Sequence, residues 1–221
     1  MPYDPDAAQR NVSTITRTDA NRAETTVHRA DDREVRLTII RIIRDHLRDP
    51  HPHTWCGYDL DFTGTTFDGG DFSGAMFSGG LVSFDRATFS GGLVSFDRAT
   101  FSGGEVSFDR ATFSGPEVWF GWATFGGGLV SFDRATFSGG KVRFGLATFS
   151  GEVWVPFDKA TFNGGKVAFL GATFSGGKVV FDEASFSGGE VFVVARFSGG
   201  SVDRDGEPFR GWSAKHGFHS P

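Results

Sequence analysis

The sequence predicts an all-β fold, a right-handed four-sided β-solenoid preceded by a short helix. Composition gives the first indication, because phenylalanine accounts for 26 and glycine for 32 of the 221 residues. Such a bias favours one kind of structural site used many times. The second indication is repetition: segments 77–88 and 89–100 are the same 12-residue sequence, FSGGLVSFDRAT.

The third indication is the spacing of the phenylalanines. From Phe62 to Phe77 they recur every five residues, and after Phe77 the intervals alternate between seven and five. One additional residue near Pro156 shifts the series. These intervals fit neither the 3.6-residue period of a helix nor a long strand. The expected core ladder includes Phe84, Phe89, Phe96, Phe101, Phe108, Phe113, Phe120 and Phe125.

A small or apolar residue precedes each phenylalanine by two positions, as Val82 precedes Phe84 and Ala87 precedes Phe89. Side chains at positions i−2 and i of a strand point to the same face, so both should point inward. Ser-Gly-Gly segments mark corners. Strands this short cannot bury a phenylalanine alone and must stack. Four corners per turn give about six coils, with about 24 residues per turn after a first coil of about 20.

Several segments match a known repeat unit. LDFTG at 60–64 and GDFSG at 70–74 resemble the pentapeptide-repeat family, whose unit is a small residue, a polar residue, then Leu or Phe and two more. Later segments such as ATFSG at 87–91 carry threonine where the family prefers aspartate or asparagine, and the two-residue insertions depart from the strict family period. The resemblance covers roughly 58–200 and implies the stacked coils described above.

Four segments follow. Residues 1–30 are polar, show no periodicity and are expected to be disordered. Residues 31–57 hold an amphipathic helix and a linker, 58–200 the solenoid, and 201–221 a C-terminal cap or tail. Because a solenoid exposes apolar side chains at each end, the helix is expected to cap the first coil. The alternative is that the helix contacts a second copy, a lipid or a nucleic acid.

The expected apolar side of this helix consists of Val35, Ile39, Ile42, Ile43 and Leu47, and the opposite side of Arg33, Arg36, Arg41, Arg44 and Arg48. At the other end, Phe209, Trp212 and Phe218 are expected to cover the last coil. The alternative there is a homodimer through this terminal cap, as in some members of the family that the sequence resembles. The first residues also resemble an internal point of longer, membrane-anchored relatives.

Charge and ligand chemistry favour a binding protein. Residues 58–200 hold fifteen acidic and ten basic residues, and the net charge is −5. The repeated pairs Asp85-Arg86, Asp97-Arg98, Asp109-Arg110 and Asp133-Arg134 should form salt-bridge ladders on the outside. The linker residues His46, His51, His53 and Cys56 lack the paired spacing of zinc sites, so no metal is expected.

No catalytic set, phosphate loop or dinucleotide fingerprint is present in the sequence, so neither enzymatic activity nor a cofactor is expected. The function that the sequence favours is a scaffold for protein–protein interaction, with an unknown partner. The alternative is a DNA-mimicking inhibitor or protector of a topoisomerase such as gyrase, which some pentapeptide-repeat proteins are. No direct nucleic-acid binding and no membrane segment are expected, which favours the cytoplasm.

One group of outward positions departs from the polar pattern. Trp119 and Trp122 flank Phe120, and one coil further the equivalent positions are Arg143 and Leu146. Ala168 and Gly171 follow another coil on. Tryptophan and arginine are enriched in binding hot spots, so this group is the candidate partner patch. The alternative is that the two tryptophans only cover the corners of their own coil.

Overall fold

The computed structural model describes residues 12–19, 22–29, 32–48, 53–115 and 117–208. The chain divides into two units, Met1–Ile39 and Ile40–Pro221. Helix α1 (Asp32–His46) begins in the first unit and ends in the second. Within the first unit, β1 (Val12–Asp19) and β2 (Arg22–Arg29) pair as an antiparallel hairpin.

This hairpin differs from the disorder expected for residues 1–30. Val, Ile and Thr make up half of its strand residues, and β-branched side chains favour extended backbone. The low-hydrophobicity criterion for disorder does not detect this preference. The rest of residues 1–30 lies outside the described residues.

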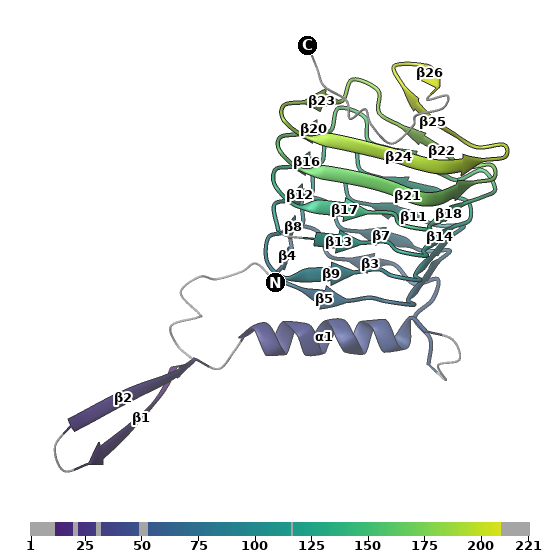
Figure 1. Cartoon of the computed structure of the whole chain (residues 1–221). Helices are drawn as coiled ribbons and strands as arrows, with labels where there is room; N and C mark the ends of the chain where they lie inside the picture. Colours follow the sequence, from purple (N-terminus) through teal and green to yellow (C-terminus); the bar gives the residue numbers. More distant parts are fainter. Residues whose placement is uncertain (1–11, 20–21, 30–31, 49–52, 116, 209–221) are drawn as a thin grey trace. The chain divides into compact units, whose positions relative to one another are not determined.

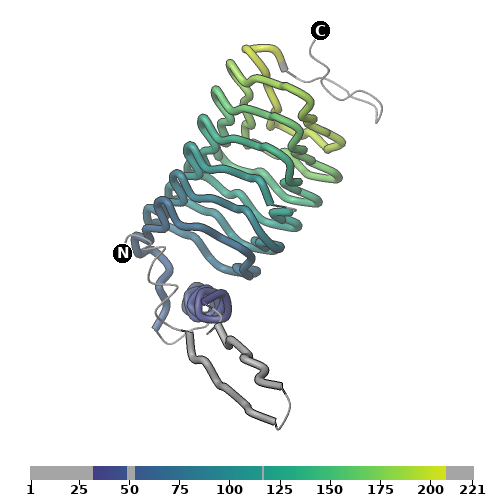
Figure 2. Tube along the Cα trace, turned by 90° about the vertical axis from the view of Figure 1, so that its left-hand side faces the viewer, coloured from purple at the N-terminus to yellow at the C-terminus, as the bar shows by residue number. Residues whose placement is uncertain are grey.

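The second unit is a stack of about six coils with four faces, confirming the four-sided β-solenoid (Figures 1 and 2). Face 1 consists of β3 (Leu60–Asp61), β7 (Leu81–Ser83), β11 (Glu105–Ser107), β15 (Leu129–Ser131), β19 (Trp154–Pro156), β22 (Lys178–Val180) and β25 (Ser201–Arg204). Face 2 consists of β4 (Thr66–Phe67), β8 (Thr88–Phe89), β12 (Thr112–Phe113), β16 (Thr136–Phe137), β20 (Thr161–Phe162) and β23 (Ser185–Phe186).

Faces 3 and 4 are joined in the upper coils, where single long strands pass round the corner between them. Face 3 consists of β5 (Gly70–Asp71), β9 (Leu93–Ser95), β13 (Glu117–Trp119), β17 (Lys141–Arg143) and the first halves of β21 (Lys166–Phe174) and β24 (Glu190–Phe197). Face 4 consists of β6 (Met76–Ser78), β10 (Thr100–Ser102), β14 (Thr124–Phe125), β18 (Thr148–Phe149) and the second halves of β21 and β24.

The register confirms the 24-residue turn and corrects two details. Glu105 pairs with Leu129, 24 residues later, whereas in the first coil Leu60 pairs with Val82, 22 residues later and not 20. The first coil is longer because the seven-residue interval after Phe77 closes it. Trp154 pairs with Leu129, 25 residues earlier. The additional residue therefore lies before Trp154, and not at Pro156.

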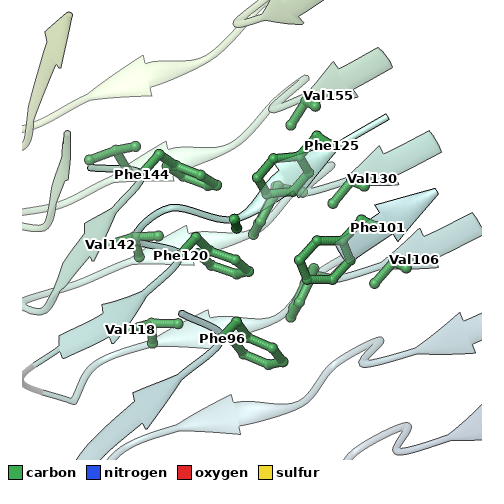
Figure 3. Close-up of a cluster of buried hydrophobic side chains, with 14 of the residues drawn as sticks. Phe96, Phe101, Val106, Val118, Phe120, Phe125, Val130, Val142, Phe144 and Val155 are labelled. Atoms are coloured by element: carbon green, nitrogen blue, oxygen red, sulfur yellow. The ribbon is translucent and has the colours of Figure 1, made fainter. Parts of the chain in front are cut away.

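Stacked aromatic columns fill the interior. All eight phenylalanines of the expected ladder are buried. Rings one coil apart are nearly parallel, as for Phe84 and Phe108, whose centroids lie 4.7 Å apart at 4°. Carbon atoms make optimal contact at about 3.5–4.0 Å, so parallel rings with this separation are displaced sideways, the arrangement that aromatic quadrupoles prefer. Figure 3 shows Phe96, Phe120 and Phe144 one above another, with Phe101 and Phe125 in the next column.

Phenylalanines from opposite sides of the coil also meet across the interior. Phe84 and Phe96 contact edge to face, with centroids 5.7 Å apart at 88°, and Phe96 contacts Phe108 in the same way. The smaller inward residues, such as Val118 and Ala123, fill the space beside the rings and are buried. The core is therefore continuous along the stack, with each coil packed against the next.

Helix α1 meets the first coil through its second half. Ile40 and Leu47 are buried in the core cluster. The first coil has no preceding coil to satisfy its backbone, and unpaired buried backbone groups are costly. The amide of Met76 donates to the carbonyl of Leu47 at 2.7 Å, and Arg48 Nε donates to the carbonyl of Ser73 at 2.9 Å. These bonds support the capping role.

The face of α1 that packs matches the expected face only in part, because Leu47 and Ile43 pack but Val35 and Ile39 are exposed. Ile42 is half exposed, Ile43 is only partly buried, and Arg44 faces the coil and pairs with Asp71. The first coil needs hydrogen-bond donors for its carbonyl groups and a cation beside Asp71. This need explains why the packed face of the helix is rotated toward its arginines. Burial opposes ionisation of Asp71, but hydrogen bonds from Ser73 and the charge of Arg44 outweigh it and hold its pKa below the ordinary value.

The solenoid continues beyond the expected boundary at residue 200. β25 pairs in parallel with β22, and β26 (Glu207–Pro208) then turns back antiparallel on β25. Phe209, Trp212 and Phe218, expected to cover the last coil, lie outside the described residues. Within the described ranges, no helix has the length and apolar character needed to cross a membrane.

Truncating one ring of a middle coil should locally weaken the stack. We expect Phe113→Ala to lower the free energy of unfolding by roughly 3–5 kcal/mol through lost transfer energy and the cavity left behind. Phe113 stacks on Phe89 and Phe137 at 4.8 Å. Chemical denaturation measures the change, with the neighbouring outward residue in Thr112→Ala as the control. A loss below about 1 kcal/mol would show that Phe113 contributes little to the core.

Candidate interaction site

The structure brings together the four residues of the candidate patch at the corner between Faces 3 and 4. Trp119 ends β13 and lies in register with Arg143 at the end of β17. At the corner, the amide of Trp122 donates to the carbonyl of Gly145 at 2.8 Å, and the amide of Leu146 donates to that of Leu170 at 2.9 Å. Trp122 and Leu146 therefore occupy equivalent positions on successive coils, as the sequence predicts.

These four residues surround a hollow of about 270 Å³, here called the corner groove. It is lined by Asp97, Trp119, Gly121, Trp122, Arg143, Gly145, Leu146 and Leu170. The hollow exists because the residue after the inward phenylalanine is glycine in two successive coils, at Gly121 and Gly145. The coil before has Asp97 at that position and the coil after has Leu170, so side chains close the hollow at both ends.

A network of polar contacts fixes Trp119 in the groove. Its indole Nε1 donates to Glu117 Oε2 at 2.7 Å. Arg143 Nη2 donates to Glu117 Oε1 at 2.6 Å, and the guanidinium lies over the Trp119 ring, 5.9 Å from its centroid. A cation above an indole is attracted by the electron-rich face of the ring. Trp119 is therefore half-buried and fixed by Glu117 and Arg143. The alternative that it covers the corner of its own coil accounts for part of its role.

Trp122 is held differently. It is 57% exposed, and the guanidinium of Arg98 lies over its ring, 5.8 Å from the centroid. Its backbone φ is +53°, and that of Leu146 is +58°. This left-handed region is unfavourable for a residue with a side chain. The hypothesis that Trp122 merely covers its own corner does not explain this exposure.

Sequence reasoning missed two apolar members of this corner. Leu170 and Val194 are exposed and lie in register with each other in β21 and β24. The repeat contains the signal, because Leu170 follows Phe169 as Gly145 follows Phe144. The predicted patch continued through Ala168 and Gly171, one on either side of the corner. It did not include Leu170, which lies between Phe169 and Gly171.

A second hollow of about 330 Å³ lies beside the inserted residue of Face 1. It is lined by Glu152, Val153, Trp154, Gly176, Lys178, Val180 and Asp182. Trp154 is exposed, but its register partner in the next coil is Lys178, which pairs with Asp203 at 2.9 Å. Exposed apolar side chains therefore do not continue through successive coils here as they do at the corner groove.

The linker shows no metal centre. His46 stacks on Trp55 with ring centroids 4.2 Å apart, and the Sγ of Cys56 lies 3.8 Å from the carbonyl oxygen of Leu47. Among the residues that the structure describes, no group of three or more His, Cys, Asp or Glu side chains is placed to hold a metal ion. His51 lies outside those residues.

Comparison with known proteins identifies the repeat. Residues 62–104 match the family model for pentapeptide repeats, described as nine copies. The chain therefore contains pentapeptide repeats in its first coils. The match begins where the phenylalanines recur every five residues and extends into the part with alternating spacing, and the coil geometry continues the same fold to β25. No curated protein sequence matches the chain.

Aspartates of this pentapeptide-repeat solenoid form a column on the corner between Faces 1 and 2, but not the expected salt-bridge ladder. Within the described residues, no ion pair joins an arginine to Asp85, Asp109 or Asp133 of this column, or to Asp97 at the corner between Faces 3 and 4. Hydroxyl groups one coil above donate instead, Ser107 to Asp85 and Ser131 to Asp109. Exposed ion pairs contribute little to stability. The serine hydroxyl of the next coil is held by the fold within hydrogen-bonding distance of the carboxylate.

The hydroxyl donors end in the middle of the column. The position that Ser107 and Ser131 occupy is taken by Pro156 in the coil above Asp133 and by Val180 in the coil above Asp158. Burial and neighbouring aspartates raise the pKa of both Asp133 and Asp158. A raised pKa means that the fold favours the protonated acid. The protonated form of each acid therefore stabilises the fold below the unfolded pKa of about 3.8, and this contribution is lost as the pH rises through the folded pKa.

We therefore expect Asp158→Asn to stabilise the solenoid at neutral pH. Solvent screening limits the gain to about 0.5 kcal/mol, and the gain should vanish near pH 3. Urea denaturation of variant and wild type at both pH values measures the difference. In the control Asp85→Asn, the carboxylate bonded to Ser107 is lost, so no gain is expected. An equal gain at both pH values would contradict the electrostatic origin.

Proposed function

We propose that the chain is a non-enzymatic scaffold that binds a protein partner at the corner groove. One observation carries the proposal: Trp122 and Leu146 are large, apolar and half exposed in a backbone conformation that favours glycine. The equivalent corner residues of other coils are Gly74, Arg98 and Gly171, which also have positive φ.

The fold does not require these two side chains. A left-handed residue with a side chain costs roughly 1–2 kcal/mol relative to its usual conformation, and exposure forfeits most of the benefit of burying an indole. Arginines such as Arg86, Arg98 and Arg110 have the same left-handed backbone in other coils, so the exposed apolar side chain distinguishes Trp122 and Leu146. Tryptophan is also the residue type most enriched in binding hot spots. Partner binding accounts for both costs.

Rigidity supports the same proposal. The groove lies on four packed coils and its walls are fixed by the contacts of Trp119 with Glu117 and Arg143. A pre-organised surface loses little conformational entropy when it binds, which leaves more of the contact energy as affinity. A repeat scaffold is suited to this role because its surface is built from parallel columns of side chains.

The DNA-mimic alternative has less support. A mimic of DNA presents a continuous acidic face, and the aspartate column from Asp85 to Asp182 is the longest acidic feature of the described coils. Each member up to Asp158 is followed directly by a basic residue, from Arg86 to Lys159. The alternating charges weaken the field of the column.

The proposal predicts that binding and stability respond oppositely to one substitution. Trp122→Gly places in this coil the residue found at the same position in others, so we expect stability to stay equal or to rise by up to about 1 kcal/mol. Partner capture on immobilised full-length chain should be lost. Arg110→Gly is the matched control, because Arg110 has φ +58° at the corner between Faces 1 and 2. It should leave partner capture unchanged.

The measurement compares the proteins captured by wild type, Trp122→Gly and Arg110→Gly from the same lysate, beside their thermal unfolding. Trp154→Ser adds a second control, since Trp154 is 51% exposed on Face 1. A partner that binds Trp122→Gly as well as wild type would contradict the proposal. A partner lost only in Trp154→Ser would assign binding to the second hollow instead.

A further inference from the structure

We propose that the partner presents an acidic amphipathic α-helix, which lies along the corner groove parallel to the axis of the stack. This inference rests on the proposed function and specifies what the groove binds. Four features of the described coils support it: an apolar strip, its spacing, the absence of an open sheet edge, and a local excess of positive charge.

The apolar strip runs through four successive coils. Trp122, Leu146, Leu170 and Val194 each lie at the corner between Faces 3 and 4, and each is 43% exposed or more. Trp122 and Leu146 occupy one column of this corner, and Leu170 and Val194, which lie in register, occupy the adjacent column, one residue nearer the inward phenylalanine. Large apolar groups that adjoin along one edge are more informative than scattered ones, because contiguous exposed patches mark interaction sites.

The spacing of the strip matches a helix better than an extended segment. Successive coils are separated by about 4.8 Å, and successive turns of an α-helix by about 5.4 Å. The mismatch is therefore about 0.6 Å per contact. Alternate side chains of an extended segment recur every 6.6–6.8 Å or so, a mismatch of roughly 2 Å per contact. Only the helix can keep its apolar side chains beside all four coils.

Backbone pairing with the partner is not available at the groove. β13 is hydrogen-bonded to β9 and β17, and β21 is bonded to β17 and β24. A partner strand would need an unpaired sheet edge in order to add to the sheet. Recognition at these coils must therefore use side chains, as when a helix places its apolar face in a groove.

Charge selects an acidic helix. Face 3 carries Lys141 and Lys166 in register with each other, and Arg143 two residues beyond Lys141. Arg143 pairs with Glu117, and Lys166 pairs with Glu190. Lys141 makes no ion pair within the described residues. Glu117 and Glu190 neutralise the other two cations, so this side of the groove keeps one net positive charge on a chain of net charge −5. The other side presents threonines such as Thr124 and Thr148.

The glycines explain where the helix would place its largest side chain. Gly121 and Gly145 leave the hollow between Trp119 and Trp122. A Cβ on Gly145 would meet only the carbonyl oxygen of Leu170, at 3.8 Å, which is ordinary contact. Gly145→Asp therefore fills the hollow without backbone strain and reproduces the residue that Asp97 supplies two coils earlier. This variant blocks the groove and leaves both tryptophans in place.

The test uses a synthetic helical probe of about 15 residues, long enough for four turns. Its leucines occupy positions i, i+4, i+7 and i+11, with glutamates along one flank and a fluorophore at the end. We expect fluorescence anisotropy to show binding to full-length wild type, weakened at least about tenfold by Gly145→Asp. A second probe with lysines in place of glutamates should bind about tenfold more weakly. Lys141→Glu should narrow that difference.

A third probe keeps the composition of the first and replaces two central residues by proline, which prevents the helix. It should not bind. If it binds as well as the first, or if the lysine probe binds better, the inference is overturned. Concentration-dependent dimerisation that Gly145→Asp abolishes would overturn it too, by assigning the groove to a second copy of the chain.

These outcomes are distinguishable from failure of the proposed function. If the helical probe does not bind, yet partner capture is lost in Trp122→Gly and kept in Arg110→Gly, the groove binds a protein and the helical occupant is wrong. If capture is unaffected by Trp122→Gly, the proposed function itself is wrong. Thermal unfolding of Gly145→Asp confirms that the variant is folded before any probe is titrated.

Discussion

The spacing between coils is the constraint on which the rest of the structure depends. Backbone hydrogen bonds between parallel strands fix it at about 4.8 Å. Each side chain is consequently placed directly beside its equivalent in the next coil. For the inward phenylalanines this produces parallel rings with centroids 4.6 to 5.2 Å apart in the middle of the stack, a distance at which displaced rings pack well. For the aspartates it produces mutual repulsion, which hydroxyl donors relieve where the sequence supplies them.

The same constraint turns small departures from the repeat into surface features. At the corner between Faces 3 and 4 the segment FDRA of residues 96–99 becomes FGWA at 120–123, FGLA at 144–147 and FLGA at 169–172. The glycines open a hollow, and the tryptophan and leucines line it. Because coils are rigidly stacked, these changes in three neighbouring coils make one continuous groove. The opposite corner keeps its aspartates and basic residues and has no such strip.

The sequence predicted what the repeat determines. The inward phenylalanines follow from the spacing, and the four faces and the register of Trp119 with Arg143 follow once four corners are taken per turn. What it did not predict depends on contacts that the spacing does not contain. The packed face of α1 is set by the first coil's need for partners, which Arg44 and Arg48 supply. The hydroxyl ladder depends on whether a serine lies two residues before the aspartate of the next coil.

Leu170 is an instructive omission. Its position after Phe169 could be counted from the sequence, but its importance appears only when the corner is seen in three dimensions, between Leu146 and Val194. The left-handed backbone of Trp122 is a similar case. In other coils this left-handed position holds arginines such as Arg98 and Arg110, and only the structure shows that an exposed indole occupies it.

The number of residues per turn is the claim on which the groove depends, because an exact 12-residue repeat also fits a coil half as long. Thr112 and Thr136 are register partners in the 24-residue turn. A 12-residue turn would instead place Thr112 beside Thr124. The direct measurement is disulfide formation, on a Cys56→Ser background, by Thr112→Cys with Thr136→Cys and by Thr112→Cys with Thr124→Cys. Neighbouring strands bring Cα atoms within the roughly 4.4–6.8 Å that a disulfide spans. The account predicts that oxidation cross-links the first pair and not the second, and cross-linking of the second pair alone would contradict it.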